Sequence, residues 1–381
     1  MCSTSGSIRV SNSNRNPHDA SSAPVDFAVS AVIESAAGQN RRDSAGPWRA
    51  AFRRLRNDRL GMVCVVIVIA YMLLVLGSAL GLIARDWSRE AGVSYANPGF
   101  LAQRENLEAE SSRNLTAQPK VPPVDLSDID PLAPYYRELD ERTAKIKVTE
   151  VRRADTLPFG GDKWGKDVIK KTVKGAEISI FVGFAAALIA TILGTVFGAF
   201  SGYFGGRTND LFEWLYNVFT SIPYILLILA FAAVFGKGIA TVIMILGITG
   251  WTGIYRLVRA EYIKHREREY VRAADAIGAS NLRRMFVQIL PNVSHVILVQ
   301  LSQHVVQFIK AEVILSFLGF GVPIELVSWG TMLAEAQNEL VIGKWWQLVA
   351  ATASMAVLVT AFSLFTDALR DALDPRLKAL L

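Results

Sequence analysis

The sequence LGMVCVVIVIAYMLLVLGSALGLIA, at residues 60–84, contains no charged side chain and is bounded by Arg59 and Arg85. The hydrocarbon core of a bilayer is about 30 Å thick, so a helix that crosses it needs about 20 mostly apolar residues. This stretch therefore predicts a membrane-spanning helix. The composition agrees, because 51% of the 381 residues are hydrophobic and only 19% are charged.

Five further apolar stretches of similar length follow the first one. We expect each to cross the membrane as a helix, which makes six spans in one all-α integral membrane bundle. Short connections between most of them predict that consecutive spans are antiparallel neighbours. The five stretches are residues 178–203, 209–235, 238–258, 292–318 and 346–368.

Lysine and arginine side chains concentrate in two segments beside the spans. Residues 49–59 hold five arginines, and residues 256–284 hold eight Lys and Arg side chains. Short loops rich in these residues stay on the cytoplasmic side, so both segments, and with six spans both termini, are predicted to lie inside. The same rule accounts for the net charge of +6, so nucleic acid is not expected as a partner.

The chain divides by composition into five segments. Its start is rich in Ser and Asn and has too little apolar content to offset the entropy of ordering. The predicted segments are a disordered cytoplasmic tail at 1–46, a basic flank and anchor span at 47–84, an extracytoplasmic insertion at 85–175, a five-span core at 176–368 with a cytoplasmic loop at 259–291, and a cytoplasmic tail at 369–381.

The cytoplasmic loop contains EYVRAADAIGASNLRRMFVQILPN at residues 269–292. Apolar residues recur at helical spacing up to Gly278, where a left-handed cap would end a first helix. Ser280 can cap a second helix, which we expect Pro291 to interrupt. Two interpretations remain open from the residues alone: a docking surface for a partner protein, with Ala273 and Ala274 on the exposed face, or an amphipathic segment on the membrane surface.

A polar stripe lies on the predicted span at 292–318. Gln300, Gln303, His304 and Gln307 fall on one helical face, with Lys310 at its edge. These side chains could form hydrogen bonds between packed helices or line a passage for a polar substrate. The number of polar groups on one face favours the passage.

Two further places carry turn-forming residues. Pro223 removes one backbone hydrogen bond within the predicted span at 209–235, where it could kink a gate or be accommodated by neighbouring helices. The outer loop at 319–345 holds Gly319, Gly321, Trp329 and Gly330. This loop could place Trp329 at the membrane interface or receive a protein that delivers substrate.

Several motifs of other protein classes are absent from the sequence. No G-x4-G-K-[ST] phosphate loop occurs, so the chain is not expected to bind or hydrolyse ATP. The four histidines form no H-E-x-x-H pair and no G-x-S-x-G elbow is present, which argues against an enzyme or a metal site. A secondary transporter usually has ionisable groups near the bilayer centre, and Glu213, Lys310 and Glu312 all lie toward span ends.

The loop resembles the signature of ABC importer permeases, A-A-x3-G followed after nine residues by x-x-L-P. Ala273, Ala274, Gly278, Leu290 and Pro291 match it, while Arg272 replaces a frequent Glu and Gln288 a frequent Ile. Further stretches resemble the C-type subunit of the oligopeptide and dipeptide permease family. These are GDKWGKD at 161–167, GYFGG at 202–206, SIP at 221–223, EYVRAA at 269–274, LSFLGFG at 315–321, SWGTML at 328–333 and LRDALDPRL at 369–377.

The resemblance implies a six-helix type I permease bundle in a bacterial inner or plasma membrane, with the loop as a coupling helix. Expected partners are a homologous second permease, one or two ATPase subunits that hydrolyse ATP, an extracytoplasmic binding protein and lipid; the chain itself would bind no cofactor. The cargo would be peptide, or alternatively a metal chelate, opine or glycoside. The residues assigned to ATPase coupling are Glu269, Tyr270, Ala273, Ala274, Gly278, Leu282, Phe286, Leu290 and Pro291.

Overall fold

The computed structural model describes residues 55–101, 135–136, 142–143, 153–323 and 325–373. All of them belong to one unit, Arg53–Leu381. The predicted tail at 1–46, much of the insertion at 85–175 and residues 374–381 lie outside the described residues, so those predictions stay as they are.

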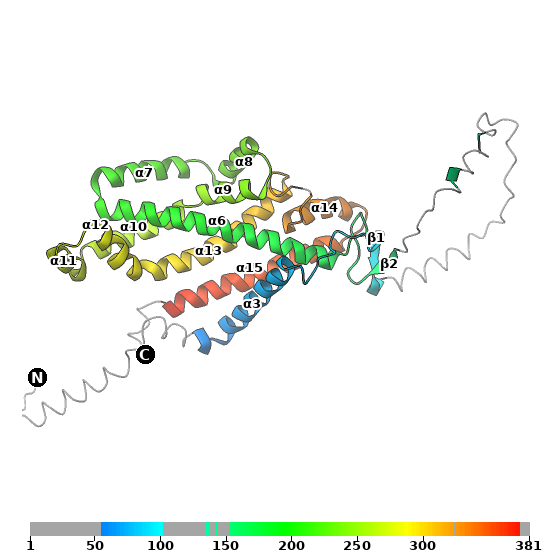
Figure 1. The fold of residues 1–381 in the computed structure, drawn as a ribbon, viewed down its shortest axis with the longest axis horizontal. Coiled ribbons are helices and arrows are strands. Elements are labelled where there is room, and N and C mark those ends of the chain that lie inside the picture. Colours follow the sequence, from blue (N-terminus) through cyan, green and yellow to red (C-terminus); the bar gives the residue numbers. More distant parts are fainter. Residues whose placement is uncertain (1–54, 102–134, 137–141, 144–152, 324, 374–381) are drawn as a thin grey trace, which may run out of the picture. The chain divides into compact units, whose positions relative to one another are not determined.

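Among the described residues, five helices are long and apolar enough to cross a membrane (Figure 1). Two of these spans combine shorter elements. The first combines α9 (Ile239–Thr249) with α10 (Thr252–Arg266), and the second combines α12 (Asn281–Arg283), η1 (Arg284–Ile289) and α13 (Leu290–Phe317). The five spans are α3 (Arg59–Ala79), α6 (Val168–Phe204), Ile239–Arg266, Asn281–Phe317 and α15 (Trp346–Leu373).

The predicted span at 209–235 is not one straight helix. Residues 209–235 are divided between α7 (Gly206–Thr220) and α8 (Tyr224–Phe235), which meet at an angle of 85°. Pro223 lies at the break and precedes α8, because its ring and missing N–H do not permit the helix to continue through it. The count is six only if this bent pair is taken as one span.

Helix α6 is the central element and packs against α3, α9, α10, α13 and α15. It begins at Val168, ten residues before the span expected from hydropathy, with Asp167 as its N-cap. Charged residues such as Lys171 lower the mean hydropathy of its first turns, so these turns were not predicted as part of the span. The last residues of the predicted insertion, 168–175, are therefore helical. At 37 residues, α6 is about 56 Å long and extends well beyond a bilayer core of about 30 Å.

A glycine face lets α10 approach α6 closely. A Cβ on Gly198 would lie 2.9 Å from the Cβ of Val258, and one on Gly202 would lie 2.6 Å from the carbonyl oxygen of Arg259. Small residues four apart are a common device for backbone contact between membrane helices. The G-x3-G-x3-G spacing at 194–202 could have indicated this contact from the sequence.

The part of the chain before α6 contains a small parallel sheet, which the all-α prediction did not include. β1 (Gly92–Pro98) pairs with β2 (Ala154–Leu157), and the two strands lie near the start of α6 (Figure 1). Gly165 has a φ of +74° and its carbonyl accepts a hydrogen bond from the Gly92 N–H. Residues 160–167 are thereby held against β1.

The predicted outer loop contains a helix, α14 (Trp329–Val341). Ser328 and Thr331 form a capping box at its start. Trp329 is fully buried, and its Nε1–H donates to the Thr172 carbonyl of α6 at 3.2 Å. An interfacial position for Trp329 is therefore wrong, because α14 packs against α6, α13 and α15 and covers the indole.

Candidate functional site

The predicted helix, turn and second helix of the loop at 269–292 are confirmed. Helix α11 (Glu269–Ala276) ends just before Gly278, which has a φ of +81°. The Ala279 N–H donates to the Ala274 carbonyl at 3.0 Å, and Ser280 caps the next helix through the Arg283 N–H. A Cβ on Gly278 would meet nothing within 4 Å, so the backbone conformation alone favours glycine there.

Pro291 does not interrupt the second helix, contrary to expectation. The helix runs from Asn281 to Phe317 and includes a π-helical segment, Arg284–Ile289. Pro291 occupies the first turn of α13, directly after this segment. The helix continues through Pro291 for two reasons. The hydrogen-bond spacing of a π-turn differs from that of an α-helix, and proline is tolerated in the first turn of a helix.

The structure divides the predicted coupling residues between an exposed and an inward-facing set. Ala273, Tyr270 and Leu282 are exposed, whereas Ala274 is 5% exposed and thus does not belong to the exposed face. Phe286 is half-buried and packs edge-on against Phe200 of α6. The sequence prediction omitted Ile277, the most exposed large apolar residue of the loop at 85%.

Polar contacts attach this loop to the ends of α6 and α10. The Tyr262 hydroxyl donates to the Met285 carbonyl, and Arg266 donates to the carbonyl of Tyr203 at 3.0 Å. Arg284 pairs with Asp275 of α11 at 2.6 Å and lies over the ring of Tyr203. These contacts connect the loop directly to α6 and α10.

Arg272, one of the departures from the signature, pairs with Glu267 at 3.1 Å. This hydrogen bond, together with one from Arg266, holds the pKa of Glu267 below its usual value. The side chain of Arg272 is 70% exposed. In this chain Arg272 therefore forms a surface ion pair within the loop and makes no buried contact.

A second polar cluster, which the sequence prediction missed, joins α7 to α6 and α10. Arg259 donates to the amide oxygen of Asn209 at 2.7 Å and pairs with Glu213 at 3.2 Å. Tyr255 contacts Ser201 at 3.1 Å and Glu213 at 3.3 Å. The cluster holds α7 beside the central helices before the chain bends at Pro223.

The polar stripe of α13 is only partly on an open face. Gln300 and Gln303 are half-buried and hydrogen-bonded to each other at 3.1 Å, while Gln307 and Lys310 are exposed. His304 is buried, lies 3.4 Å from the Thr191 hydroxyl of α6 and stacks on Phe308. His304 therefore contributes to packing between α13 and α6.

The residues predicted to form the outer surface are mostly internal. A Cβ on Gly330 would lie 2.6 Å from the Val313 carbonyl oxygen, and one on Gly321 would lie 2.1 Å from the Ser316 hydroxyl. Trp329 is buried, as described above. Gly319, with a φ of +83°, has open space beside it. Pro223 lies at the 85° bend between α7 and α8.

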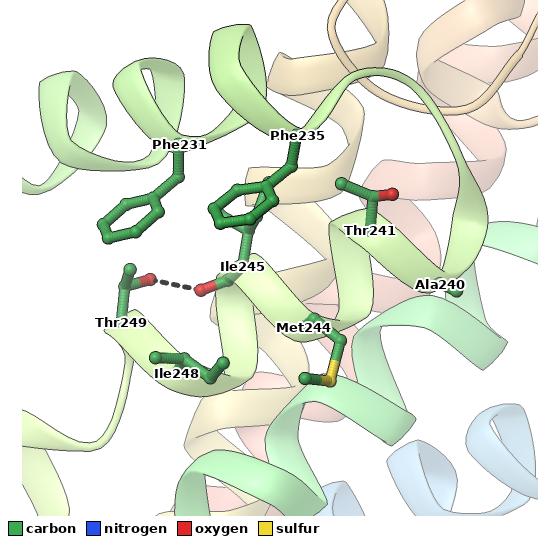
Figure 2. Close-up of a pocket in the computed structure, with 8 residues that line it drawn as sticks. All are labelled: Phe231, Phe235, Ala240, Thr241, Met244, Ile245, Ile248 and Thr249. Carbon is green, nitrogen blue, oxygen red and sulfur yellow. Dashed lines mark hydrogen bonds between the residues drawn. The ribbon is translucent and has the colours of Figure 1, made fainter.

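An apolar pocket of about 360 Å³ lies between α8 and α9 (Figure 2). Phe231 and Phe235 point from α8 toward α9. The Thr249 hydroxyl donates to the Ile245 carbonyl at 2.7 Å, so this polar group is already satisfied within its helix. The pocket suits an apolar group, and no predicted site residue lines it. Its lining consists of Phe231, Phe235, Ala240, Thr241, Met244, Ile245, Ile248 and Thr249.

Residues 194–379 match the family described as binding-protein-dependent transport system inner membrane component. Two curated Bacillus subtilis (strain 168) proteins align with the chain. The oligopeptide transport system permease protein OppC is 36% identical over 246 residues, which cover 65% of this chain and 80% of that protein. The dipeptide transport system permease protein DppC is 37% identical over 220 residues, which cover 58% and 69%. The chain belongs to this inner membrane component family.

OppC of Escherichia coli (strain K12) is 37% identical over 218 residues, which cover 57% of this chain and 72% of that protein. A chain of the MetNI methionine ABC transporter aligns with a TM-score of 0.44 at 15% identity, over 54% of this chain and 96% of that one. The family assignment rests on the sequence matches.

Membership in the binding-protein-dependent family confirms three predictions: the resemblance to peptide permeases of the C type, the membrane-spanning helical fold, and a role as a transport subunit instead of an enzyme. The matched segment of this inner membrane component includes α10, the loop, α13, α14 and α15. The chain is thus a multi-pass permease of an importer that depends on a binding protein.

Proposed function

We propose that this permease forms half of the translocation pathway of an ATP-driven peptide importer, paired with a homologous second permease subunit. The observation that carries the proposal is the match to permeases named for oligopeptide and dipeptide transport, over two thirds or more of their length. Metal chelates, opines and glycosides are the alternative cargoes.

In this proposal α11 docks into a groove of a cytoplasmic ATPase, which binds and hydrolyses the ATP. Three large side chains of the loop are exposed and belong to no buried apolar cluster among the described residues. They are Tyr270 at 39%, Ile277 at 85% and Leu282 at 57%. An exposed apolar group on a short helix is a suitable anchor for a partner groove. The contacts of Arg284 and Tyr262 would transmit ATPase closure to α6 and α10.

The open part of the α13 stripe would form a hydrated wall of the pathway. Gln307 and Lys310 are exposed on a membrane-spanning helix, and contact between lipid chains and such groups is costly. Water or a second permease subunit would therefore cover this face. Glutamine offers both a donor and an acceptor, so it can match a peptide backbone in any register.

The orientation that fits these roles places the loop end of α6 in the cytoplasm and the strand end outside, with both termini of the chain inside. The binding protein would then dock at the strand end. Phe100, Phe159 and Trp345 form an aromatic group at the surface there, with ring centroids 6.1 to 6.4 Å apart. This group is better exposed than Trp329 or Gly330.

The test is uptake by proteoliposomes that contain the chain with its partner permease and ATPases, using the cognate binding protein and labelled di- to pentapeptides. We expect uptake that requires ATP and the binding protein and persists when the proton gradient is collapsed. Uptake without ATPase that stops with the proton gradient would instead indicate a secondary transporter. Mass spectrometry of the ligand that co-purifies with the binding protein separates peptides from the alternative cargoes.

A further inference from the structure

A largely buried group of charged and polar side chains joins α6, α14, α15 and the segment 160–167 at the strand end of α6. The Lys171 ammonium lies 2.7 Å from the carboxylate of Asp162 and 2.5 Å from that of Glu335 on α14. It also donates to the side-chain oxygen of Gln347 on α15 at 3.4 Å. The side chains of Lys171 and Asp162 are 4% and 0% exposed.

Glu339 lies one turn after Glu335 on the same face of α14 and is 1% exposed. Neither oxygen of its carboxyl has a hydrogen-bond partner among the described residues. The backbone of Lys163 approaches the carboxyl and lowers its pKa without meeting the geometry of a hydrogen bond. An ionised Glu339 would be a buried carboxylate with no donor.

The charges that surround Glu339 do not balance it. Lys171 of α6 attracts its charge, whereas Asp162, beside the strands, and Glu335, on α14, repel it. The ammonium of the nearby Lys344 is directed elsewhere, to Asn97 and the ring of Trp346. Three carboxyl groups thus face one ammonium, which is already engaged by two of them.

Protonation is the simplest way to remove this imbalance. A neutral carboxyl is far less costly to bury than an unpaired carboxylate. Burial accordingly raises the pKa of Glu339 from the ordinary 4.5 to about 7. Within the described residues, no group of three or more His, Cys, Asp or Glu side chains is arranged to hold a metal ion.

We propose that Glu339 is a proton-binding site through which the pH on the strand side of the membrane controls how tightly α14 packs against α6 and α15. With the proton bound, the cluster holds one ammonium and two carboxylates. When the proton leaves, the additional negative charge weakens the packing of α14 against α6 and α15. This proposal does not depend on the identity of the cargo.

The direction of the pH effect follows from the raised pKa. A group that binds its proton more tightly in the packed state contributes its full stabilisation below the pKa of the free state. That stabilisation is lost as the pH rises from about 4.5 to about 7. Opening of α14 should therefore become roughly tenfold or more easier between about pH 5.5 and 8.

The test is hydrogen–deuterium exchange of the α14 backbone in the full chain, reconstituted in lipid nanodiscs and corrected for the intrinsic pH dependence of exchange. In wild type, corrected exchange of residues 329–341 should rise at least tenfold over this pH range. Glu339→Gln, which mimics the protonated form, should exchange slowly at every pH. Glu325→Gln, an exposed carboxyl just before α14, is the matched control and should behave as wild type.

A second readout uses wild type and does not require that the variant folds. A component of the infrared carbonyl band of protonated carboxyls should be present at neutral pH and titrate near 7, apart from any signal of the buried Glu312 carboxyl. Its absence, or corrected exchange that does not change with pH, would overturn the proposal. A change that follows the sodium or calcium concentration at fixed pH would also overturn it, because the site would then hold a metal cation.

Discussion

The ion pairs near the two ends of α6 differ in how deeply they are buried. Near Tyr203, at the loop end, ion pairs such as Arg272 with Glu267 are exposed, and open space surrounds Gly278. Near Lys171, at the strand end, an ion pair between the buried side chains of Lys171 and Asp162 is linked to Glu335 of α14 and Gln347 of α15. Exposed pairs contribute little to stability, whereas removal of one partner of a buried pair is strongly destabilising. The loop end is thus suited to docking of a partner protein, and the strand end is suited to pH-dependent packing of α14.

The largest effect should come from Lys171→Met. This change leaves the buried Asp162 and the half-buried Glu335 without their cation, and loss of one partner of a buried pair typically costs about 3–5 kcal/mol. The free energy of unfolding, measured by denaturant titration of the purified chain in detergent, should fall by that amount. Lys170→Met is the matched control, because Lys170 forms an exposed pair with Asp86. Equal effects at the two lysines would abolish the contrast between buried and exposed pairs.

At the loop end, Ile277→Asp should weaken association with the ATPase without changing stability. Covering an isoleucine side chain contributes about 2 kcal/mol, which corresponds to roughly 30-fold in affinity. Binding of purified ATPase to the permease in nanodiscs measures this loss. Val341→Asp is the control, since that residue is 86% exposed but lies at the strand end. If both variants bind the ATPase normally, α11 is not the docking helix.

Between the two ends, Gln303 and Gln307 test whether the α13 face is open to substrate. Replacing both with Leu removes two hydrogen-bonding groups at about 0.6 kcal/mol each. Peptide uptake should slow roughly 5- to 10-fold, while the melting temperature falls only slightly through loss of the bond between Gln300 and Gln303. Ser302→Ala, which removes a buried hydroxyl from another face, should leave uptake unchanged. A lower melting temperature with normal uptake would support a packing role instead.

The smallest effect is expected for Arg272→Glu. The pair with Glu267 is exposed, so its loss should leave the melting temperature unchanged. The depressed pKa of Glu267 should return toward its usual value, because the hydrogen bond from Arg272 is its largest cause. Carboxyl titration by NMR of a labelled loop peptide and thermal melting of the whole chain check the two outcomes. Clear destabilisation would mean that the loop end is more rigid than the exposed pairs suggest.

Local patterns predicted features whose causes are local. The helical spacing before Gly278 and the capping hydroxyl of Ser280 were sufficient for the loop, and uninterrupted apolar stretches were sufficient for most spans. Hydropathy could not reveal the bend at Pro223, because the apolar composition continues across it. It also missed the first turns of α6, because Lys171 lowers the local average although its charge is neutralised by distant residues.

Features that depend on long-range packing could not be predicted. Ala274 and Phe286 share helical faces with exposed neighbours, and only packing against other elements, such as Phe200 of α6 in the case of Phe286, decides that they face inward. His304 has the correct phase for the polar stripe, yet Thr191 of α6 lies beside it. Pro291 was expected to end a helix because a π-turn cannot be recognised from composition. Glu335 and Glu339 lie near Lys171 only because α14 packs against α6, and the sequence does not show this packing.

The 37-residue length of α6 has a mechanical consequence. A straight rod of about 56 Å that tilts by about 10° around its midpoint moves each end by about 5 Å, in opposite directions. That displacement is close to one helical turn. The docking loop and the proton site would therefore shift together whenever α6 rocks in the bilayer, so the two aqueous compartments can be linked by rigid-body geometry without any relay of side chains through the membrane.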